Sequence, residues 1–316
     1  MRKLLCAILA LMLLLSFAGC GKEAEPVDPP EPVPEEAPQV QEPTWMTLPA
    51  DRELTAQQYF VYDCEAGDFV TISADAGERV YPASITKLFT AYVAGQYLSS
   101  DKIVEVGDAL DLVGWGSSVA ELQKGDQITV EMLIAGMMLP SGNDAANVLA
   151  AEAGRALADD SEIIGVQEFV AEMNRQAKIL GMQNTHFANP DGIHQDDHYS
   201  SLGDLAILGT LALEDPVLMQ YAGTAHETVQ LASGAKQWKN TNALINPESP
   251  YYCPYAIGLK TGQTPSAGSC LLSAFEYEDR TYVIGVFGCP EEEDRFPDTL
   301  QLFNTAIGYT GDSQEQ

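Results

Sequence analysis

Residues 81–93 read YPASITKLFTAYV, a stretch that predicts both a local structure and a chemistry. The hydroxyl of Ser84 and the amine of Lys87 are three residues apart, so on a helix they share one face about a turn apart. The apolar run from Leu88 to Val93 predicts that this helix is buried. Serine is a weak nucleophile, and a desolvated lysine with a lowered pKa can act as its base. The stretch therefore predicts a serine nucleophile with a lysine base.

The backbone of Ser84 is also expected to contribute. Pro82 precedes it and the apolar run begins after it, so Ser84 lies near the amino-terminal end of the predicted helix. A backbone N–H at this position lies at the positive end of the helix dipole. It can stabilise the negative oxygen of a tetrahedral intermediate.

A second motif, Ser141-Gly142-Asn143, lies in a turn between two predicted helices. The first helix is expected to run to about residue 140 with Thr129 as its cap, and the second spans 144–153. In such a turn a hydroxyl can relay a proton, and an amide can hydrogen-bond a substrate backbone.

The third motif, Lys260-Thr261-Gly262, is predicted to lie on a β-strand. It precedes a hairpin pattern in which 270–275 and 282–287 flank a polar turn. Gly262 has no side chain, so we expect it to permit the close approach of a substrate backbone.

Each motif is common alone, but the ordered set of the three is specific. In its Ser-Asp-Asn form it is found in penicillin-binding proteins and class A β-lactamases. Further segments carry the same resemblance: 81–88, 116–118, 139–147, 189–193 and 258–262. Over residues 49–292 the chain resembles the low-molecular-mass penicillin-binding proteins, specifically the serine D-alanyl-D-alanine carboxypeptidases of peptidase family S11.

The resemblance implies a role for each motif residue. Ser84 would be the acylated nucleophile, Lys87 its general base, and Ser141 a proton relay to the departing D-alanine. Asn143 would bind a peptide carbonyl, and Lys260 and Thr261 would bind the terminal carboxylate. Gly262 is the next implied substrate-binding residue. The N–H of Gln263 would complete an oxyanion hole with the N–H of Ser84. Water would then release a peptide of the peptidoglycan stem one D-alanine shorter. β-Lactam antibiotics would acylate the same serine, and no cofactor is expected.

Three alternatives stay open from the sequence. A β-lactamase usually needs a glutamate that activates water, and the segment 243–246 has none three residues before Ile245. A non-catalytic wall-binding lipoprotein would have no reason to keep the nucleophile, the base, the relay and the carboxylate-binding strand together. An endopeptidase acting on cross-links performs the same chemistry and differs in the width of its cleft.

The chain is strongly acidic, with 16 Lys plus Arg against 46 Asp plus Glu and a net charge of −30. This balance argues against a nucleic-acid partner. A pocket containing Lys87 and Lys260 would be cationic on such a surface, and a substrate that ends in a carboxylate needs a local positive partner.

Residues 1–19 are predicted to be a lipoprotein signal peptide. Arg2 and Lys3 precede an apolar stretch, 4–17, that is shorter than a membrane-spanning helix and typical of a secretory signal. It leads into Phe-Ala-Gly-Cys, which resembles a bacterial lipobox, so we expect cleavage before Cys20 and lipid on its sulfur. The protein is therefore expected to be secreted across the bacterial cytoplasmic membrane and anchored at its outer face.

The predicted tether, residues 20–48, follows this anchor. Its part 21–44 contains seven prolines and seven acidic residues with almost no large apolar groups, so it cannot bury a core. The transpeptidase-like carboxypeptidase domain is expected at 49–292, and a C-terminal helix with a polar tail at 293–316.

Within that domain, helical segments lie between two sets of strands, which indicates an α+β fold. An early hairpin is predicted at 59–64 and 69–73, helices continue to about residue 213, and strands return near Lys260. The resemblance implies a β-lactamase/DD-peptidase-like fold, in which one five-stranded antiparallel sheet is flanked by helices and faces a helical subdomain.

Cysteines and histidines offer no metal site by their spacing. Beyond Cys20 the chain has Cys64, Cys253, Cys270 and Cys289, none with zinc-like spacing, and we expect four buried free thiols. Cys270 and Cys289 are expected to lie diagonally across the late hairpin, a poor geometry for a disulfide. His194 and His198 are four residues apart, but they follow a loop and lack the metalloprotease glutamate, so no metal ion is expected.

Overall fold

The computed structural model describes residues 44–49, 52–160 and 164–309. The predicted signal peptide, Cys20 and the tether up to residue 43 lie outside the described residues. Within the range expected for the tether, α1 (Thr44–Thr47) is helical and packs on α8 (Arg295–Ile307), with Trp45 buried. No helix of the described part has both the length and the apolar character needed to cross a membrane.

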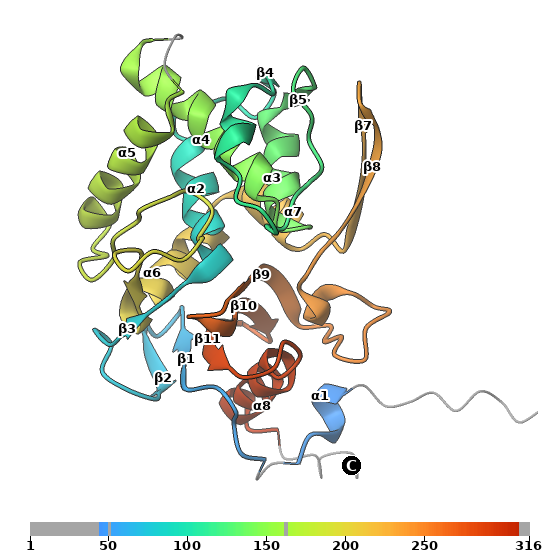
Figure 1. Cartoon of the computed structure of the whole chain (residues 1–316). Coiled ribbons are helices and arrows are strands. Elements are labelled where there is room, and N and C mark those ends of the chain that lie inside the picture. The colour runs from blue at the N-terminus through green and yellow to red at the C-terminus, as the bar shows by residue number, and fades with distance from the viewer. Residues whose placement is uncertain (1–43, 50–51, 161–163, 310–316) are drawn as a thin grey trace, which may run out of the picture. The chain divides into compact units, whose positions relative to one another are not determined.

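A five-stranded antiparallel sheet forms the centre of the fold, as expected (Figure 1). Its strand order is β2-β1-β11-β10-β9. The strands span Gln58–Asp63 (β1), Asp68–Ile72 (β2), Ala256–Thr264 (β9), Gly268–Tyr277 (β10) and Arg280–Cys289 (β11). Strands from both ends of the sequence are therefore neighbours: β1 pairs with β11, with Val61 opposite Ile284. Both predicted hairpins are confirmed.

Helices cover both faces of this sheet, which explains why its central strands are almost wholly apolar. Successive side chains of a strand point to opposite faces. Val283 accordingly packs in the core beneath α6 (Leu202–Leu213), whereas Ile284 packs in the core beneath α8. A Cβ on Gly209 of α6 would lie 2.4 Å from a methyl of Val283, so glycine allows the helix to lie close to the sheet.

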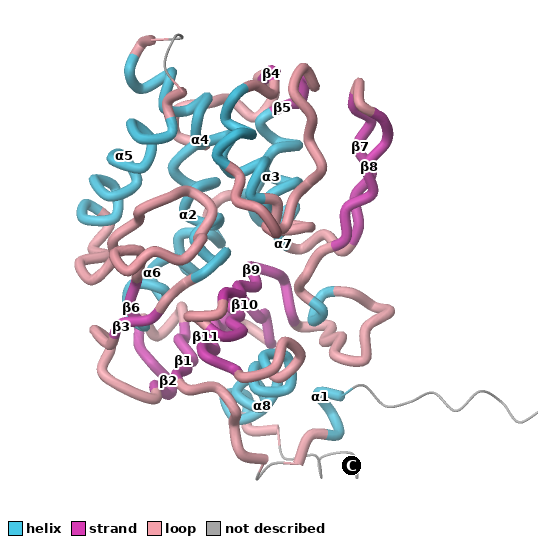
Figure 2. The backbone as a smooth tube through the Cα atoms, in the orientation of Figure 1, coloured by secondary structure: helices cyan, strands magenta, loops and turns pink. Residues whose placement is uncertain are grey.

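The remaining helices form the helical subdomain beside β9 (Figure 2). They are α2 (Thr86–Ala94), α3 (Val130–Met138), α4 (Asn143–Ala158), α5 (Val166–Ile179) and α7 (Pro216–Ala222). Thr129 caps α3 by accepting from the N–H of Met132, as predicted, and Ser201 caps α6 in the same way. Two short ladders connect its loops: β3 (Arg79–Val80) with β6 (Ser200–Ser201), and β4 (Ile103–Glu105) with β5 (Gln127–Thr129).

One hairpin was missed by the sequence analysis. β7 (His226–Leu231) and β8 (Gly234–Lys239) form a two-stranded ladder that stands apart from the central sheet (Figure 1). Trp238 is buried and its indole N–H donates to the carbonyl of Ala120 at 3.0 Å. Alternating polar and apolar residues around Ser233-Gly234 were the available signal.

The four cysteines are free thiols in this structure, as expected. Cys253, Cys270 and Cys289 are buried, whereas Cys64 is only half-buried. Ser269, not Cys270, lies opposite Cys289 in the ladder, so the two cysteines of the hairpin are diagonal.

Candidate active site

Ser84 lies in a tight turn, Ala83–Ile85, immediately before α2. Ala83 has a φ of 48°, in the left-handed region that residues with a side chain rarely adopt. Two glycines press against this turn from different elements. A Cβ on Gly192 would lie 1.9 Å from the carbonyl oxygen of Ala83, and one on Gly262 would lie 2.8 Å from that of Pro82. The serine is thus held between the loop at 189–193 and strand β9.

This contact gives Gly262 a structural reason besides the expected approach of a substrate backbone. The Ser84 turn of the protein itself lies in the space next to it. A Cβ on Gly262 would also lie 3.3 Å from the backbone nitrogen of Ser84. Gln263, the next residue on β9, is exposed. The two expected oxyanion donors therefore belong to segments in direct contact.

Lys87 is fully buried and its Nζ is surrounded by three oxygens. It is 2.9 Å from Ser84 Oγ, 2.7 Å from Asn143 Oδ1 and 2.7 Å from the carbonyl oxygen of Asp191. Burial lowers the pKa of Lys87 from its ordinary 10.5 to about 8, although the negative charges of Asp191 and Asp144 oppose this shift. At pH 7 about a tenth of Lys87 is therefore neutral, and the neutral fraction rises toward pH 8.

The chemistry of these oxygens orients the amine. The amide oxygen of Asn143 and the carbonyl of Asp191 can only accept hydrogen bonds. A neutral amine has two protons, and these two acceptors engage both. Its lone pair is then left for the proton of Ser84, which is what a general base for this serine requires.

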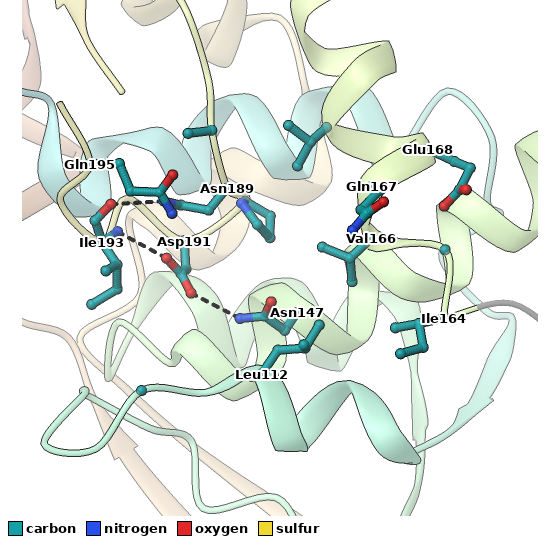
Figure 3. A pocket seen from close by; sticks show the side chains of 15 residues that line it. Leu112, Asn147, Ile164, Val166, Gln167, Glu168, Asn189, Asp191, Ile193 and Gln195 are labelled. Carbon is teal, nitrogen blue, oxygen red and sulfur yellow. Dashed lines mark hydrogen bonds between the residues drawn. The ribbon is translucent and has the colours of Figure 1, made fainter. Parts of the chain in front are cut away.

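Asp191 is a residue of the site that the sequence analysis did not assign. Its carboxylate accepts from Asn147 Nδ2 at 2.9 Å and from the N–H of Ile193 at 2.9 Å (Figure 3). Its backbone carbonyl accepts from Lys87. Asn147 also donates to the backbone oxygen of Asn143 at 2.8 Å. One side chain of α4 thus bonds both residues that accept from Lys87. The available signal was the Asn-Pro-Asp-Gly turn, in which Gly192 has a φ of 87°.

His198, in the segment that we had considered for a metal ion, contacts the first motif. It is buried, and its Nε2 is 2.8 Å from the hydroxyl of Thr86, between Ser84 and Lys87. The N–H of Ala188 donates to Nδ1 at 3.2 Å, so Nε2 carries the proton and donates to Thr86. Burial lowers the pKa of His198 to about 4, which keeps it neutral.

The second motif connects α3 to α4. Ser141 is buried with a φ of 61°, and Asn143 is the first residue of α4 rather than part of the turn. The N–H of Asn143 donates to the carbonyl of Ser118 at 2.9 Å. Asp144 accepts from the N–H groups of Ala120 and Leu122 at 2.7 and 3.0 Å. These bonds attach the loop at 116–122 to the motif.

Lys260 is the second buried lysine, on β9. Within the part of the chain that the structure describes, its Nζ has only long contacts: 3.2 Å to the carbonyl of Thr261, and 3.4 Å to the hydroxyls of Thr241 and Thr261. The two hydroxyls are 2.6 Å apart. Burial lowers the pKa of Lys260 well below its ordinary value, and the positive charges of Lys87 and Arg295 lower it further. An anion bound here would raise the pKa of Lys260, against the effects of burial and of the two positive charges.

Arg295, the first residue of α8, was also missed. It is 3% exposed, and its Nη1 is 3.4 Å from the carbonyl of Gly262. Nη2 bonds Glu292 at 2.9 Å, whereas Nε is buried with no hydrogen-bond partner among the described residues. Nothing in the sequence connects it to the third motif, because only the packing of α8 against the sheet brings it there.

Two pockets adjoin these residues, and no residue lines both of them. The Asp191 pocket, about 810 Å³, lies among α4, α5 and the loop at 188–195, and is lined by Asn147 and Asp191 (Figure 3). The Arg295 pocket, about 990 Å³, lies between residues 239–251 and the start of α8, and is lined by Thr241 and Arg295. The serine and the two lysines line neither of them.

Comparison with known proteins gives a consistent result. Residues 44–290 match the model of the Peptidase_S11 family, described as D-alanyl-D-alanine carboxypeptidase. The chain is 31% identical over 242 residues to D-alanyl-D-alanine carboxypeptidase DacF of Bacillus subtilis, covering 75% of this chain and 59% of DacF. It is 32% identical over 254 residues to D-alanyl-D-alanine carboxypeptidase of Streptomyces sp. K15, covering 77% and 84%.

The solved structures agree. The crystal structure of the Streptomyces K15 DD-transpeptidase superposes with a TM-score of 0.73 at 30% identity, covering 81% of this chain and 98% of the other. D-alanyl-D-alanine carboxypeptidase DacD of Francisella tularensis gives a TM-score of 0.69 at 25% identity, covering 82% and 72%. The chain spans about 60% of the length of several curated relatives, including DacF and DacC of Escherichia coli.

Proposed function

The chain belongs to the D-alanyl-D-alanine carboxypeptidase family, peptidase S11, and from that membership we propose that it is a serine hydrolase that removes the terminal D-alanine from peptidoglycan stem pentapeptides. The observation that carries this proposal is the position of Lys87. Its amine is buried, has a pKa of about 8, and meets Ser84 on one side and two acceptor-only oxygens on the other. That arrangement supports a serine activated by a neutral lysine.

In the proposed reaction Ser84 Oγ attacks the carbonyl of the penultimate D-alanine while Lys87 takes its proton. The N–H groups of Ser84 and Gln263 stabilise the oxyanion. Ser141 passes the proton from Lys87 to the departing nitrogen, so the carbon–nitrogen bond breaks, D-alanine leaves and the acyl-enzyme forms. Lys87, neutral again, accepts a proton from water as the hydroxyl adds to the ester, and returns that proton to Ser84 Oγ when the shortened peptide leaves.

Lys260 and Thr261 bind the terminal carboxylate in this proposal, and Arg295 joins them. Three observations support this assignment: the weak contacts of Lys260, the lowered pKa of both cations and the unpartnered Nε of Arg295. A carboxylate supplies the negative charge and the acceptors that these buried groups lack. Asn143 is assigned to a peptide carbonyl through its amide group.

β-Lactams are proposed to acylate Ser84 and leave slowly. Fast release usually depends on a separate carboxylate that activates water beside the ester. Asp191 and Asp144, the two carboxylates that act on Lys87, each accept from an N–H donor on both oxygens. Asn242, where a glutamate would have suggested a lactamase, donates to the carbonyl of Gly258. These contacts favour a penicillin-binding carboxypeptidase over a β-lactamase.

We infer that the enzyme acts outside the cytoplasmic membrane, anchored by lipid on Cys20 and carried by the tether that follows. The predicted signal peptide, the lipobox-like sequence and the Pro/Glu-rich segment support this. A Cys20→Ala variant is expected in the soluble fraction of cells. Its retention with the membrane would contradict the anchor.

The first test of the activity is labelling of the purified full chain with fluorescent penicillin, beside Ser84→Ala. Incubation with a stem pentapeptide is then followed by mass spectrometry. We expect stable labelling that requires Ser84, and loss of one alanine from the peptide. Labelling that disappears within seconds would favour the β-lactamase, and no acylation at all would favour a non-catalytic wall-binding protein.

A further inference from the structure

A tight turn beside the second motif presents an aromatic side chain to the solvent. The N–H of Ser117 donates to the carbonyl of Gly114 at 3.2 Å. Gly116, the third residue of this turn, has a φ of 78°, which glycine adopts without strain. Trp115 is the second residue of the turn, and its side chain is fully exposed. An indole in this position gains nothing from burial when the chain folds.

Both sides of the turn are attached to the rest of the protein. After it, the carbonyl of Ser118 accepts from the N–H of Asn143 at 2.9 Å. Before it, Lys124 bonds two carboxylates of the short 3₁₀ helix Asp108–Leu112 at 2.8 and 2.7 Å. Trp115 is three residues from Ser118, so their Cα atoms are at most about 11 Å apart. The indole is therefore presented close to the residue that is assigned to a peptide carbonyl.

Trp115 belongs to a group of exposed apolar side chains at the Asp191 pocket. Leu112, Ile164 and Ile193 line this pocket and are exposed (Figure 3). Gly114, next to Trp115, lines it too. Among the residues that the structure describes, eight large apolar side chains are exposed, and these four are half of them. Single exposed apolar residues are ordinary, but a group of them at a cavity indicates a binding surface. We call these four residues the Trp115 face.

The lining of the pocket argues against an anionic ligand. No lysine, arginine or histidine is among the described residues that line it. Its carboxylates are Asp191, whose two oxygens both accept N–H groups, and the exposed Glu168. A carboxylate or phosphate of a ligand would therefore find no positive partner here. The net charge of −30 likewise disfavours contact with an anionic lipid surface.

The remaining side chains fit a carbohydrate. The exposed amides of Gln167 and Gln195 line the pocket and can both donate to and accept from hydroxyl and acetamido groups. An N-acetylated amino sugar combines such groups with the C–H bonds of its ring faces. The π-face of an indole is negative, so it attracts these C–H bonds and stacks on the ring.

The distances agree with the covalent structure of the proposed substrate, whose stem peptide is joined at its amino end to an amino sugar. Four residues separate this sugar from the scissile bond, roughly 14 Å in an extended chain. The pocket begins at Asn147, which bonds both residues that accept from Lys87. It ends at Gly165, where a Cβ would lie 2.3 Å from the carbonyl oxygen of Ala151 and 2.8 Å from the nitrogen of Arg155. These two residues lie four and eight positions beyond Asn147 on α4, or about 6–12 Å along the helix.

We propose that the Trp115 face binds the N-acetylated amino sugar that carries the stem peptide, with the indole of Trp115 stacked on the sugar ring. The inference rests on the proposed function and adds a sugar subsite to the same cleft. No bond is made or broken there. The consequence is a preference for stem peptides that are still attached to glycan over free peptides.

The experiment compares two substrates of the purified full chain: a free stem pentapeptide, and the same pentapeptide on an N-acetylglucosaminyl-N-acetylmuramoyl disaccharide. The readout is the ratio of their kcat/KM values. We expect the wild type to favour the disaccharide substrate by about tenfold, near the upper limit for one aromatic contact. Trp115→Ala should bring the ratio to about one, whereas Trp115→Phe keeps an aromatic face and most of the preference. Ile103→Ala, an exposed apolar position on β4 that lines neither of the two pockets, is the control and should keep the wild-type ratio.

Fluorescence gives a readout that does not need turnover. Of the three tryptophans, Trp45 and Trp238 are buried, so a ligand in the pocket reaches only Trp115. In a Ser84→Ala background we expect the disaccharide pentapeptide, and not the free pentapeptide, to shift the emission. The shift should be absent when Trp115→Ala is added.

A wild-type ratio of one would overturn the inference, and so would a Trp115→Ala variant that keeps the wild-type ratio. An emission shift caused by phosphatidylglycerol vesicles and not by the disaccharide pentapeptide would assign the face to a membrane instead. Turnover of neither substrate would reject the proposed function. A Trp115-dependent emission shift in that case would still support the sugar subsite.

Discussion

Lys87 and Lys260 are both buried beside the Ser84 turn, yet the protein surrounds them differently. Lys87 has three oxygens within 2.9 Å, two of which can only accept. Lys260 has no oxygen nearer than 3.2 Å among the contacts of its amine, and Arg295 beside it has an unpartnered Nε. Lys87 has close hydrogen-bond partners without a substrate, whereas Lys260 does not.

The difference indicates how one cleft can use two amines for opposite purposes. A base must be neutral and aimed before substrate arrives: burial lowers the pKa of Lys87, and its internal acceptors orient the amine. An anion-binding lysine must be short of partners until the anion arrives, because strong internal partners would compete with it. Substitutions of the two lysines and of Asp191 should therefore have different effects.

Lys87→Arg keeps the positive charge but removes the base, because arginine does not deprotonate in proteins. We expect acylation of Ser84 by fluorescent penicillin to slow by about 10³-fold, within the range of general base catalysis. Lys178→Arg, at an exposed position on α5, is the matched control and should be unaffected. Labelling of the Lys87→Arg variant at the wild-type rate would exclude Lys87 as the base.

The acylation rate should also depend on pH through Lys87. Its pKa is about 8, so lowering the pH protonates the amine and removes the base. Below pH 8 the neutral fraction falls roughly tenfold per unit, which predicts about a 100-fold lower rate at pH 6 and a plateau above pH 8. Stopped-flow acylation by penicillin at fixed ionic strength measures this, and a flat profile from pH 6 to 8 would contradict a neutral-lysine base.

Lys260→Met should impair recognition of the substrate rather than the nucleophile. Loss of one hydrogen bond to a charged group, roughly 1.5–3 kcal/mol, predicts a fall of about 10- to 150-fold in kcat/KM for the pentapeptide. A pentapeptide with a terminal carboxamide lacks the negative charge, so the variant and the wild type should treat it alike. An equal loss on both peptides would mean that Lys260 acts on the chemical step.

Asp191→Asn removes the negative charge beside Lys87 and is expected to have the smallest effect of the four. The carboxylate raises the pKa of Lys87 against the effect of burial, so its neutralisation should move the midpoint of the pH–rate profile to lower pH, by roughly 1 unit or less. Asp196→Asn, fully exposed in the segment that follows, is the control. A midpoint that moves to higher pH would show that Asp191 does not act through its charge.

Local patterns were sufficient for the two hairpins of the sheet and the helices beside the motifs. Three examples lie within short windows of sequence: the alternation in β1 and β2, the apolar runs of β10 and β11, and the cap at Thr129. Such features depend on neighbours within a few residues, which is why they could be predicted. The β7–β8 hairpin was missed although its residues alternate, because Val229, Leu231 and Trp238 are its only large apolar side chains.

By itself the sequence determined the three motifs and the elements that carry them, with Ser84 and Lys87 one helical turn apart. That much follows from local geometry, since residues three apart on a helix are neighbours. Only the tertiary structure decided what surrounds the two lysines: the carbonyl of Asp191 and the amide of Asn143 at Lys87, and Arg295 with Thr241 beside Lys260. Asp191 is 104 residues from Lys87 in the chain. Burial and long-range contacts set the pKa of each amine, and no short window of sequence encodes them.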